Sequence, residues 1–332
     1  MSSSNSVALL AESLRRATGD QHAALVARVI PSLLRGIART ATALRGEHSV
    51  EKAGADNVFG DEQLNVDVSA EKHFREEIAS CPFIVAASSE EDPKEVSTSS
   101  SFENDDGTDN DVYAVAFDPL DGSSIIAPNW AVGSIIGIWA GRSAVHQDPK
   151  NQVAAILGVY GPRTTAMIAV RVPGHEDKAV CVEVGVGDST IEIVREDVRL
   201  EDTAGAKTRY FAPANLRAAS EDPKYMALVT RYISERYTLR YSGGLVPDVV
   251  HALVKGHGVY VSPVTAGSKA KLRRAFELLP VALVVECAGG MAVDPADGTR
   301  ILERPLQNLD ETAGLVCGTA EEVEKVKKAL LE

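Results

Sequence analysis

Two apolar segments of the chain each end in a pair of carboxylates. The sequence FIVAASSEED places Glu90 and Glu91 directly after one segment, and YAVAFDPLDGSS places Asp118 and Asp121 directly after the other. Strand ends are where α/β sheets place their ligand sites. Carboxylates that share one pocket raise one another's pKa, and nearby cations are what keep several of them ionised. The pattern predicts a site for hard metal ions, although the two glutamates alone could be a solvated surface and Asp-Gly a simple turn.

Further acidic residues fit the same chemistry. GDEQLNVD places Asp61 and Asp67 on a loop that leads into a helix, and Glu277 lies on the segment KLRRAFELL. Mg²⁺ takes oxygen ligands at about 2.1 Å and usually bridges carboxylates to a substrate phosphate. Two such ions about 4 Å apart can clamp the attacking and leaving oxygens of a phosphoryl displacement. We predict that Asp118 and Asp121 are metal ligands. The backbone N–H groups of the following turn are expected to bind the phosphate; they belong to Gly122, Ser123 and Ser124.

The elements that position these residues form two halves, which we expect to be an α/β chain divided into residues 1–204 and 205–332. In the first half, apolar spacing predicts a helix over residues 20–45 with a kink or break at Pro31, and a helix over residues 69–80 with Ser69 as N-cap. Residues 83–88 are expected to form a strand, and residues 92–111 an exposed loop. Short β-rich runs between residues 112 and 198 predict a meandering, partly antiparallel sheet.

The second half alternates helices and strands. We expect helices at residues 222–236, 245–255 and 269–279, the last ended by Pro280, and strands at residues 258–262 and 315–319. A T-x-x-E capping box at Thr319 and Glu322 is predicted to begin the final helix.

Composition limits the kind of partner. The 332 residues carry a net charge of −13, so a nucleic acid or an anionic membrane is not expected as the main partner. No apolar run is long enough to span a bilayer, and the N-terminus lacks a signal-peptide pattern. We expect a cytoplasmic protein, with a plastid or other organelle as the minority alternative. The four cysteines are widely spaced without CxxC and are expected to be reduced thiols.

FDPLDGSS, preceded by SEED and GDEQLNVD, resembles the fructose-1,6-bisphosphatase family of lithium-sensitive, metal-dependent sugar phosphatases. The resemblance covers the chain from about residue 20 to the C-terminus and implies a layered αβαβα fold. It implies two or three Mg²⁺ ions per active site, with Mn²⁺ as a possible substitute. It assigns metal ligation to Asp61, Glu90, Asp118, the Leu120 carbonyl, Asp121 and Glu277, and water activation to Asp67 and Glu91. It assigns contacts with the sugar phosphate to Asn215, Arg240, Tyr241, Gly243, Gly244, Leu245, Lys271 and Arg273. From the residues alone, the basic ones among these could equally be a strand edge or a solvated surface.

Within this family, YTLRYSGGLVPDV (237–249) resembles the sedoheptulose-1,7-bisphosphatases. The resemblance implies hydrolysis of the 1-phosphate of sedoheptulose 1,7-bisphosphate. A preference for fructose 1,6-bisphosphate, or use of both, is the alternative, and a catalytically silent sugar-phosphate-binding relative is a third. Arg240 often reaches across a subunit interface in this family, which implies a homo-oligomer, a dimer or a tetramer.

Two regulatory features of the family are missing from the sequence. The AMP-binding turn is replaced by ATGD at residues 17–20, and Val112 precedes Tyr113 where the family's AMP-sensitive members have lysine. No close cysteine pair is present. We therefore expect neither AMP inhibition nor redox switching.

Overall fold

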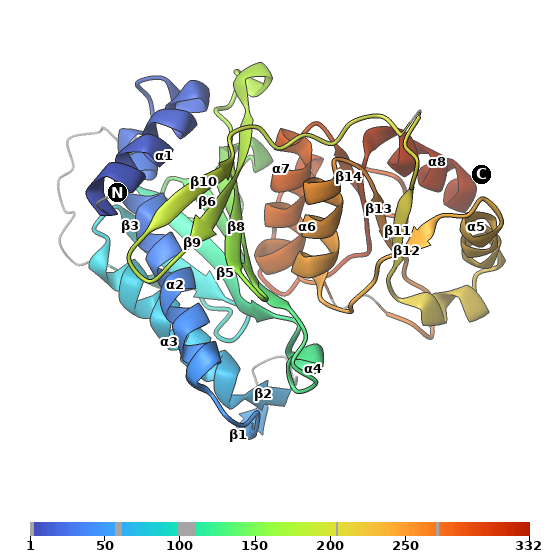
Figure 1. Cartoon of the computed structure of the whole chain (residues 1–332), viewed down its shortest axis with the longest axis horizontal. Helices are drawn as coiled ribbons and strands as arrows, with labels where there is room; N and C mark the ends of the chain where they lie inside the picture. The colour runs from blue at the N-terminus through green and yellow to red at the C-terminus, as the bar shows by residue number, and fades with distance from the viewer. Residues whose placement is uncertain (1–2, 57–61, 99–110, 204, 270–271) are drawn as a thin grey trace.

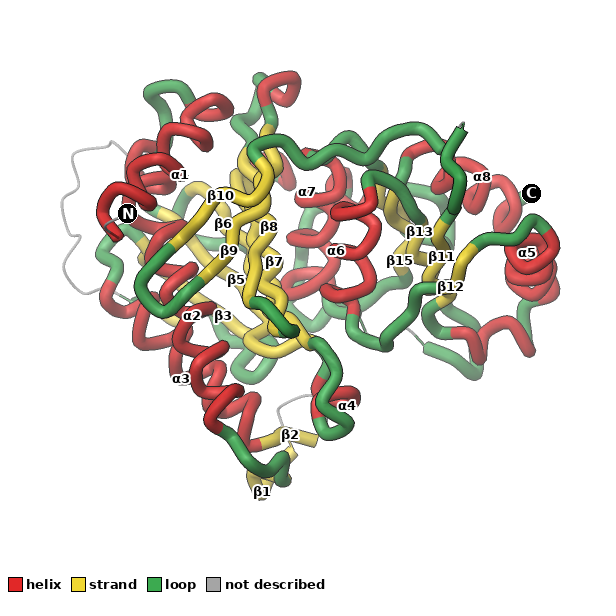
Figure 2. The backbone as a smooth tube through the Cα atoms, in the orientation of Figure 1, coloured by secondary structure: helices red, strands yellow, loops and turns green. Residues whose placement is uncertain are grey.

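The computed structural model describes residues 3–56, 62–98, 111–203, 205–269 and 272–332 (Figure 1). Helices and sheets alternate in five layers, so the expected αβαβα sandwich is confirmed (Figure 2). The outermost layers are helices from the two ends of the chain, and α6 and α7 lie between the two main sheets (Figure 1).

The first half builds an eight-stranded sheet of order β10-β9-β8-β7-β6-β5-β3-β4. The expected meander is confirmed, because every neighbouring pair is antiparallel except β3 and β5, which are parallel. The strands are β3 (Ile84–Ser89), β4 (Val96–Ser97), β5 (Tyr113–Asp121), β6 (Val132–Ala140), β7 (Gln152–Tyr160), β8 (Thr164–Val170), β9 (Val180–Val186) and β10 (Ile191–Arg195). A separate two-stranded ribbon pairs β1 (Lys52–Asp56) with β2 (Glu62–Leu64).

Three helices cover one face of this sheet: α1 (Ser3–Thr18), α2 (Ile30–Gly46) and α3 (Asn65–Ser80). A π-helical turn, Leu25–Val29, precedes α2, and Pro31 lies in the first turn of α2, where a missing N–H group costs little. The prediction that α3 begins at Ser69 is wrong. The helix begins at Asn65, four residues before Ser69, because the carboxylate of Asp67 accepts the N–H of Leu64 and stabilises an earlier first turn.

The central layer consists of α6 (Leu245–Lys255) and α7 (Leu279–Cys287). Gly133 of β6 allows α6 to approach, since a Cβ there would lie 2.4 Å from Cβ of Val246. The prediction that Pro280 ends a helix is wrong. Pro280 lies in the first turn of α7, a position that tolerates proline, and a π-helical turn, Arg274–Leu278, leads into it.

The second half builds a five-stranded sheet of order β12-β11-β13-β15-β14, covered on its outer face by α5 (Pro223–Ser234) and α8 (Ala320–Leu331). Its strands are β11 (Tyr210–Pro213), β12 (Thr238–Leu239), β13 (Val259–Ser262), β14 (Met291–Val293) and β15 (Leu315–Gly318). The predicted capping box is wrong: the Thr319 hydroxyl accepts the N–H of Gly258, and buried Glu322 accepts the Tyr237 hydroxyl. Short helices complete the chain: α4 (Ser123–Ile126) and 3₁₀ turns at Pro149–Asn151, Glu176–Lys178, Leu216–Ser220 and Ile301–Glu303.

The two sheets come from the two halves of the chain, and the division at residue 204 stays a prediction. All four cysteines are buried free thiols. Among the residues that the structure describes, no helix combines the length and the apolar character needed to cross a bilayer.

Candidate active site

Three buried carboxylates from both halves of the chain meet at the end of β5. Asp118, Asp121 and Glu277 each place one oxygen within 4.8 Å of the others, and each residue is less than a tenth exposed. The two aspartates belong to the last residues of β5, and Glu277 belongs to the π-helical turn before α7. All the donors are hard carboxylate oxygens, which fit Mg²⁺ or Mn²⁺ and do not favour softer metals.

Backbone N–H groups orient each of these carboxylates. Asp118 Oδ1 accepts the N–H of Leu120 at 2.9 Å. Asp121 accepts two N–H groups from the start of α6, Leu245 at 3.1 Å on Oδ1 and Val246 at 2.7 Å on Oδ2. Glu277 Oε2 accepts the N–H of Arg273. The first turn of a helix favours an anion, so α6 helps to hold Asp121 in its ionised form.

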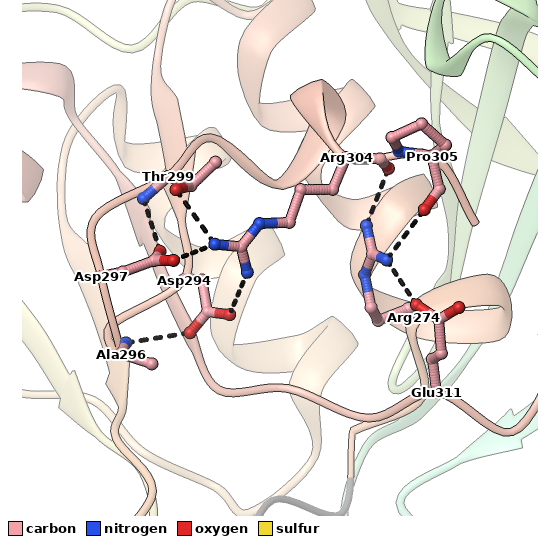
Figure 3. A network of polar contacts seen from close by, with 8 residues as sticks. All are labelled: Arg274, Asp294, Ala296, Asp297, Thr299, Arg304, Pro305 and Glu311. Carbon is pink, nitrogen blue, oxygen red and sulfur yellow. Dashed lines mark hydrogen bonds and ion pairs between the residues drawn. The ribbon is translucent and has the colours of Figure 1, made fainter. Parts of the chain in front are cut away.

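The turn that carries Glu277 is itself anchored by a buried arginine. The guanidinium of Arg274 donates to Glu311 Oε2 at 2.6 Å and to the carbonyl oxygens of Arg304 and Pro305 (Figure 3). Arg304 in turn pairs with Asp294, so the surrounding loops form one polar network (Figure 3). This network fixes the π-helical turn and therefore the position of Glu277 relative to β5.

The carboxylates remain short of positive charge despite these hydrogen bonds. Burial, with repulsion from Glu90, Asp121 and Glu277, raises the pKa of Asp118 well above its ordinary value. Burial raises the pKa of Asp121 to about 6, even though the two N–H groups oppose the rise. Burial and the charge of Glu90 raise the pKa of Glu277 well above its ordinary value, and Arg273 opposes this. Divalent cations would supply the missing compensation.

The structure brings Glu90 to this cluster, because the parallel pairing of β3 with β5 aligns Ser89 with Phe117. The N–H of Glu90 donates to the Phe117 carbonyl at 3.0 Å, so Glu90 follows its strand next to Asp118. The backbone of Leu120, a predicted carbonyl ligand, lies between Asp118 and Asp121 in the same buried segment. Asp61, another predicted ligand, lies outside the described residues.

Asp67 and Glu91 form an adjacent acidic pair. Asp67 is 3% exposed, and burial, opposed by the N–H of Leu64 and aided by repulsion from Glu91, raises its pKa to about 7. Glu91 Oε2 accepts a hydrogen bond from Gln63 Nε2 at 2.6 Å. Gln63 was not among the predicted residues, although it belongs to the quoted GDEQLNVD motif.

The predicted sugar-phosphate contacts lie on a second set of loops. Gly122, with φ +98°, turns the chain into α4 after Asp121; Ser123 and Ser124 begin that helix. Gly243, with φ +102°, lies in the turn before α6, where Gly244 is the N-cap and Leu245 the first helical residue. The carboxylate of Asp248 accepts the N–H groups of Ser242 and Gly243 and so shapes this turn. Asp248 was missed, although it belongs to the quoted LVPDV motif.

Asn215, Arg240 and Tyr241 complete this set. The side-chain amide of Asn215 donates to the Pro263 carbonyl at 2.7 Å. The backbone of Asn215 also acts on the Tyr241 hydroxyl and opposes the rise that burial causes in its pKa. The guanidinium of Arg240 lies 5.7 Å from the ring centre of Tyr210, and Tyr241 is 43% exposed. Arg273 lies by the carboxylate cluster, as its effect on the pKa of Glu277 indicates. Lys271 lies outside the described residues.

A five-layer αβαβα fold with a buried, oxygen-only acidic cluster at a strand end is the arrangement expected of the sugar-phosphatase class that the sequence resembles. Within that class, the chain belongs to the fructose-1,6-bisphosphatase family. Residues 9–185 match the family model "Fructose-1-6-bisphosphatase, N-terminal domain", and residues 205–331 match the model of the C-terminal domain.

Similar proteins include both sedoheptulose-1,7-bisphosphatases and class 1 fructose-1,6-bisphosphatases. The chain is 37% identical over 276 residues to the chloroplastic sedoheptulose-1,7-bisphosphatase of Spinacia oleracea, covering 82% of this chain and 66% of that protein. It is 34% identical over 276 residues to the class 1 fructose-1,6-bisphosphatase of Geobacter sulfurreducens, covering 82% of this chain and 80% of that protein. The chain spans just under two thirds of the length of the sedoheptulose-bisphosphatase relatives.

Solved structures agree with the fold. A crystal structure from Toxoplasma gondii, provisionally assigned as a sedoheptulose-1,7 bisphosphatase, is 35% identical with a TM-score of 0.84 and covers 97% of this chain and 98% of its own. The holo fructose-1,6-bisphosphatase of Leishmania major, 23% identical, superposes with a TM-score of 0.76 over 91% of this chain and 93% of its own. The second likeness concerns the fold alone.

Proposed function

We propose that this protein is a Mg²⁺-dependent sugar bisphosphatase that hydrolyses the 1-phosphate of sedoheptulose 1,7-bisphosphate. The observation that carries the proposal is the cluster of Asp118, Asp121 and Glu277, whose negative charge the fold compensates only in part. Family membership and the sedoheptulose-bisphosphatase relatives support the substrate class.

In this proposal the metal ions are held by the side chains of Glu90, Asp118, Asp121 and Glu277 and by the carbonyl of Leu120, with Asp61 and Mn²⁺ as further candidates. When bound, the ions would polarise the phosphoryl group and lower the pKa of the attacking water. The protein's own contribution is to orient the ligands through backbone N–H groups and to exclude water from the cluster by burial.

Asp67 and Glu91 are proposed to take the proton from the attacking water. A pKa near 7 suits a general base at neutral pH, because the group is then available to both accept and release a proton. Gln63 orients Glu91 by donating to one of its oxygens. Repulsion from Glu91 adds to the rise in the pKa of Asp67, which suits the same role.

The sugar phosphate is proposed to bind the loops around Asn215, Arg240, Tyr241 and the turn before α6. The phosphate at the metals is proposed to accept hydrogen bonds from the N–H groups of Gly122, Ser123 and Ser124 and to be attracted by the charge of Arg273. Lys271 is proposed to bind the distal phosphate. Asp248 keeps the Ser242–Gly244 turn in shape. Tyr241 and Leu239, which flank Arg240, are 43% and 53% exposed, which supports a homo-oligomer, a dimer or a tetramer, with this face at a subunit contact. The cytoplasm stays the expected compartment.

A preference for the seven-carbon sugar rests on the distal end of the site. Family members specific for fructose 1,6-bisphosphate have a tyrosine where this chain has Ser262 and a serine where it has Gly244. Tyr260, two residues before Ser262 on the same face of β13, is 7% exposed and belongs to the core under α6. In this proposal its ring stays in that core and does not replace the missing tyrosine. A difference in fit of one methylene group typically changes the free energy of transition-state binding by about 1–3 kcal/mol, so the preference should be moderate.

The test is phosphate release from the seven-carbon and six-carbon bisphosphates, each with and without Mg²⁺. We expect Mg²⁺-dependent hydrolysis of both, with kcat/KM about ten- to two-hundredfold higher for sedoheptulose 1,7-bisphosphate. Equal values would indicate the dual-specificity alternative, and a preference for the six-carbon substrate would replace the proposal with a fructose-1,6-bisphosphatase. Release of no phosphate from either substrate would indicate a silent sugar-phosphate-binding relative.

A further inference from the structure

A β-bulge lies in the segment that carries the metal-ligand candidates. In the pairing of β5 with β6, Asp118 is opposite Ile135 and Asp121 is opposite Gly133. Two residues of β5, Pro119 and Leu120, therefore face a single residue of β6, Ser134. An extra residue of this kind locally disrupts the ladder and bends the strand. A proline is compatible with a bulge, because it has no N–H to give to the ladder.

The hydroxyl of Ser134 compensates for this disruption. Ser134 Oγ donates to the Pro119 carbonyl at 2.6 Å and lies 2.6 Å from the hydroxyl of Tyr160. Ser134 has one hydroxyl proton and a carbonyl can only accept, so Tyr160 must be the donor in the second bond. Both residues are buried, at 0% and 7% exposed. A phenol is protonated at neutral pH, and burial raises the pKa of Tyr160 further. The order of donation is therefore Tyr160 to Ser134 to Pro119.

This chain of hydrogen bonds ends on the peptide unit that orients a metal-ligand candidate. The carbonyl of Pro119 and the N–H of Leu120 belong to one planar peptide. Its carbonyl end accepts from Ser134, and its N–H end donates to Asp118 Oδ1 at 2.9 Å. Rotation of that peptide would break both contacts, so the hydroxyl of Ser134 fixes the plane from which Asp118 receives its hydrogen bond.

We propose that Ser134 and Tyr160 are positioning residues that preorganise Asp118 and the Leu120 backbone for metal binding. This rests on the proposed metal dependence and adds two residues for which the function above needs no role. Outer partners of metal ligands typically contribute ten- to hundredfold to metal affinity or activity. A hydroxyl that acts through the peptide plane should affect metal affinity directly, before any substrate is present.

The experiment measures Mn²⁺ binding to the intact, substrate-free protein by electron paramagnetic resonance of the unbound ion. We expect Ser134→Ala to weaken binding about ten- to hundredfold. Ser134→Thr keeps the hydroxyl and should stay within about threefold of the unmodified protein, and Tyr160→Phe, which removes only the outer donor, should fall between the two. Thermal unfolding in EDTA, compared among the variants, identifies any that fails to fold.

Ser32→Ala is the matched control. Ser32 is a buried serine whose hydroxyl donates to the Glu77 carbonyl at 2.9 Å, on α2 and outside the bulge. Its loss should leave Mn²⁺ affinity unchanged. Unchanged affinity in folded Ser134→Ala would overturn the proposal, as would equal losses in Ser134→Ala and Ser134→Thr. Because no sugar is present, a protein that binds Mn²⁺ as expected but hydrolyses no sugar bisphosphate would contradict the proposed function and leave this inference standing.

Discussion

Asp67→Asn should make the metal-free protein more stable at neutral and alkaline pH while removing its activity. Asp67 is 3% exposed, and its pKa is raised from 3.8 to about 7, chiefly by burial. The folded protein therefore holds the carboxylate in its charged form only at a cost. Asparagine can still accept the Leu64 N–H through its amide oxygen, and it carries no charge to bury.

The sign follows from the direction of the pKa change. A raised carboxyl pKa means that the folded state binds the proton more tightly than the unfolded state, so stability falls as pH rises from about 4 to about 7. Well below pH 4 the side chain is neutral in both states and the penalty disappears. A rise from 3.8 to about 7 corresponds to about 4 kcal/mol, and relaxation around the charge reduces this, so we expect about 2–4 kcal/mol.

The assay is urea unfolding of both proteins in EDTA between pH 4 and pH 8. The free energies of unfolding should coincide near pH 4, separate through pH 5 and 6, and differ by a constant amount above pH 7. Glu192→Gln, at an exposed position on β10, is the control and should show no such separation. If the two free energies of unfolding differed by the same amount at every pH, the argument that burying the Asp67 charge destabilises the fold would be refuted. An Asp67→Asn protein that is less stable at pH 8 would refute it too. Turnover at saturating Mg²⁺ should fall by about a hundredfold or more, the scale of a positioned general base.

Three further predictions concern the same site. Asp118→Ala and Asp121→Ala should abolish turnover at saturating Mg²⁺ with far-UV circular dichroism unchanged, because removal of one member of a repulsive cluster costs metal binding and not core packing; near-normal turnover in either would contradict the ligand assignment. Glu91→Gln should bind metal and substrate normally, by calorimetry, but lose about a hundredfold or more in kcat; turnover within a few-fold of the unmodified enzyme would leave the role to Asp67 alone. AMP should have little effect on the rate, since Val112 replaces the family's lysine, and saturable inhibition at micromolar AMP would show that other residues bind it.

Local patterns in the sequence were sufficient to predict the helices and strands whose buried faces follow the spacing of apolar residues. The β-rich runs after residue 112 became the antiparallel strands of the large sheet, and the predicted helix at residues 245–255 has the bounds of α6. The strand-end placement of the carboxylates could also be predicted, because Glu90 directly follows β3 and the two aspartates lie in the last residues of β5. These features depend on residues that are close in sequence.

Features set by distant contacts were not predictable in this way. Pro280 was expected to end a helix, but a buried π-helical turn anchored through Arg274 places it at the start of α7. Thr319 was expected to cap its own helix, but its hydroxyl serves Gly258 on a neighbouring strand. Ser134 lies in an apolar run, GSIIGIWAG, and nothing in that run indicates that it faces a bulge. Each case depends on a partner far away in the sequence, which periodicity does not encode.

The site is divided between the two halves of the chain, so metal binding of the proposed kind would be coupled to folding. β5 supplies Asp118 and Asp121, but Asp121 takes its two N–H donors from α6, and Glu277 comes from the turn before α7. The cluster therefore exists only when α6 and α7 are packed against the large sheet, and the close approach at Gly133 makes that packing possible. Packing alone gathers charges that repel one another, as the raised pKa values of all three carboxyl groups indicate. Cations that neutralise this repulsion would bind the packed state and not the unpacked one, so their binding free energy contributes to holding the halves together. The same arrangement that makes this cluster costly without cations would, in the proposed function, place a metal-bridged phosphate between the two sheets.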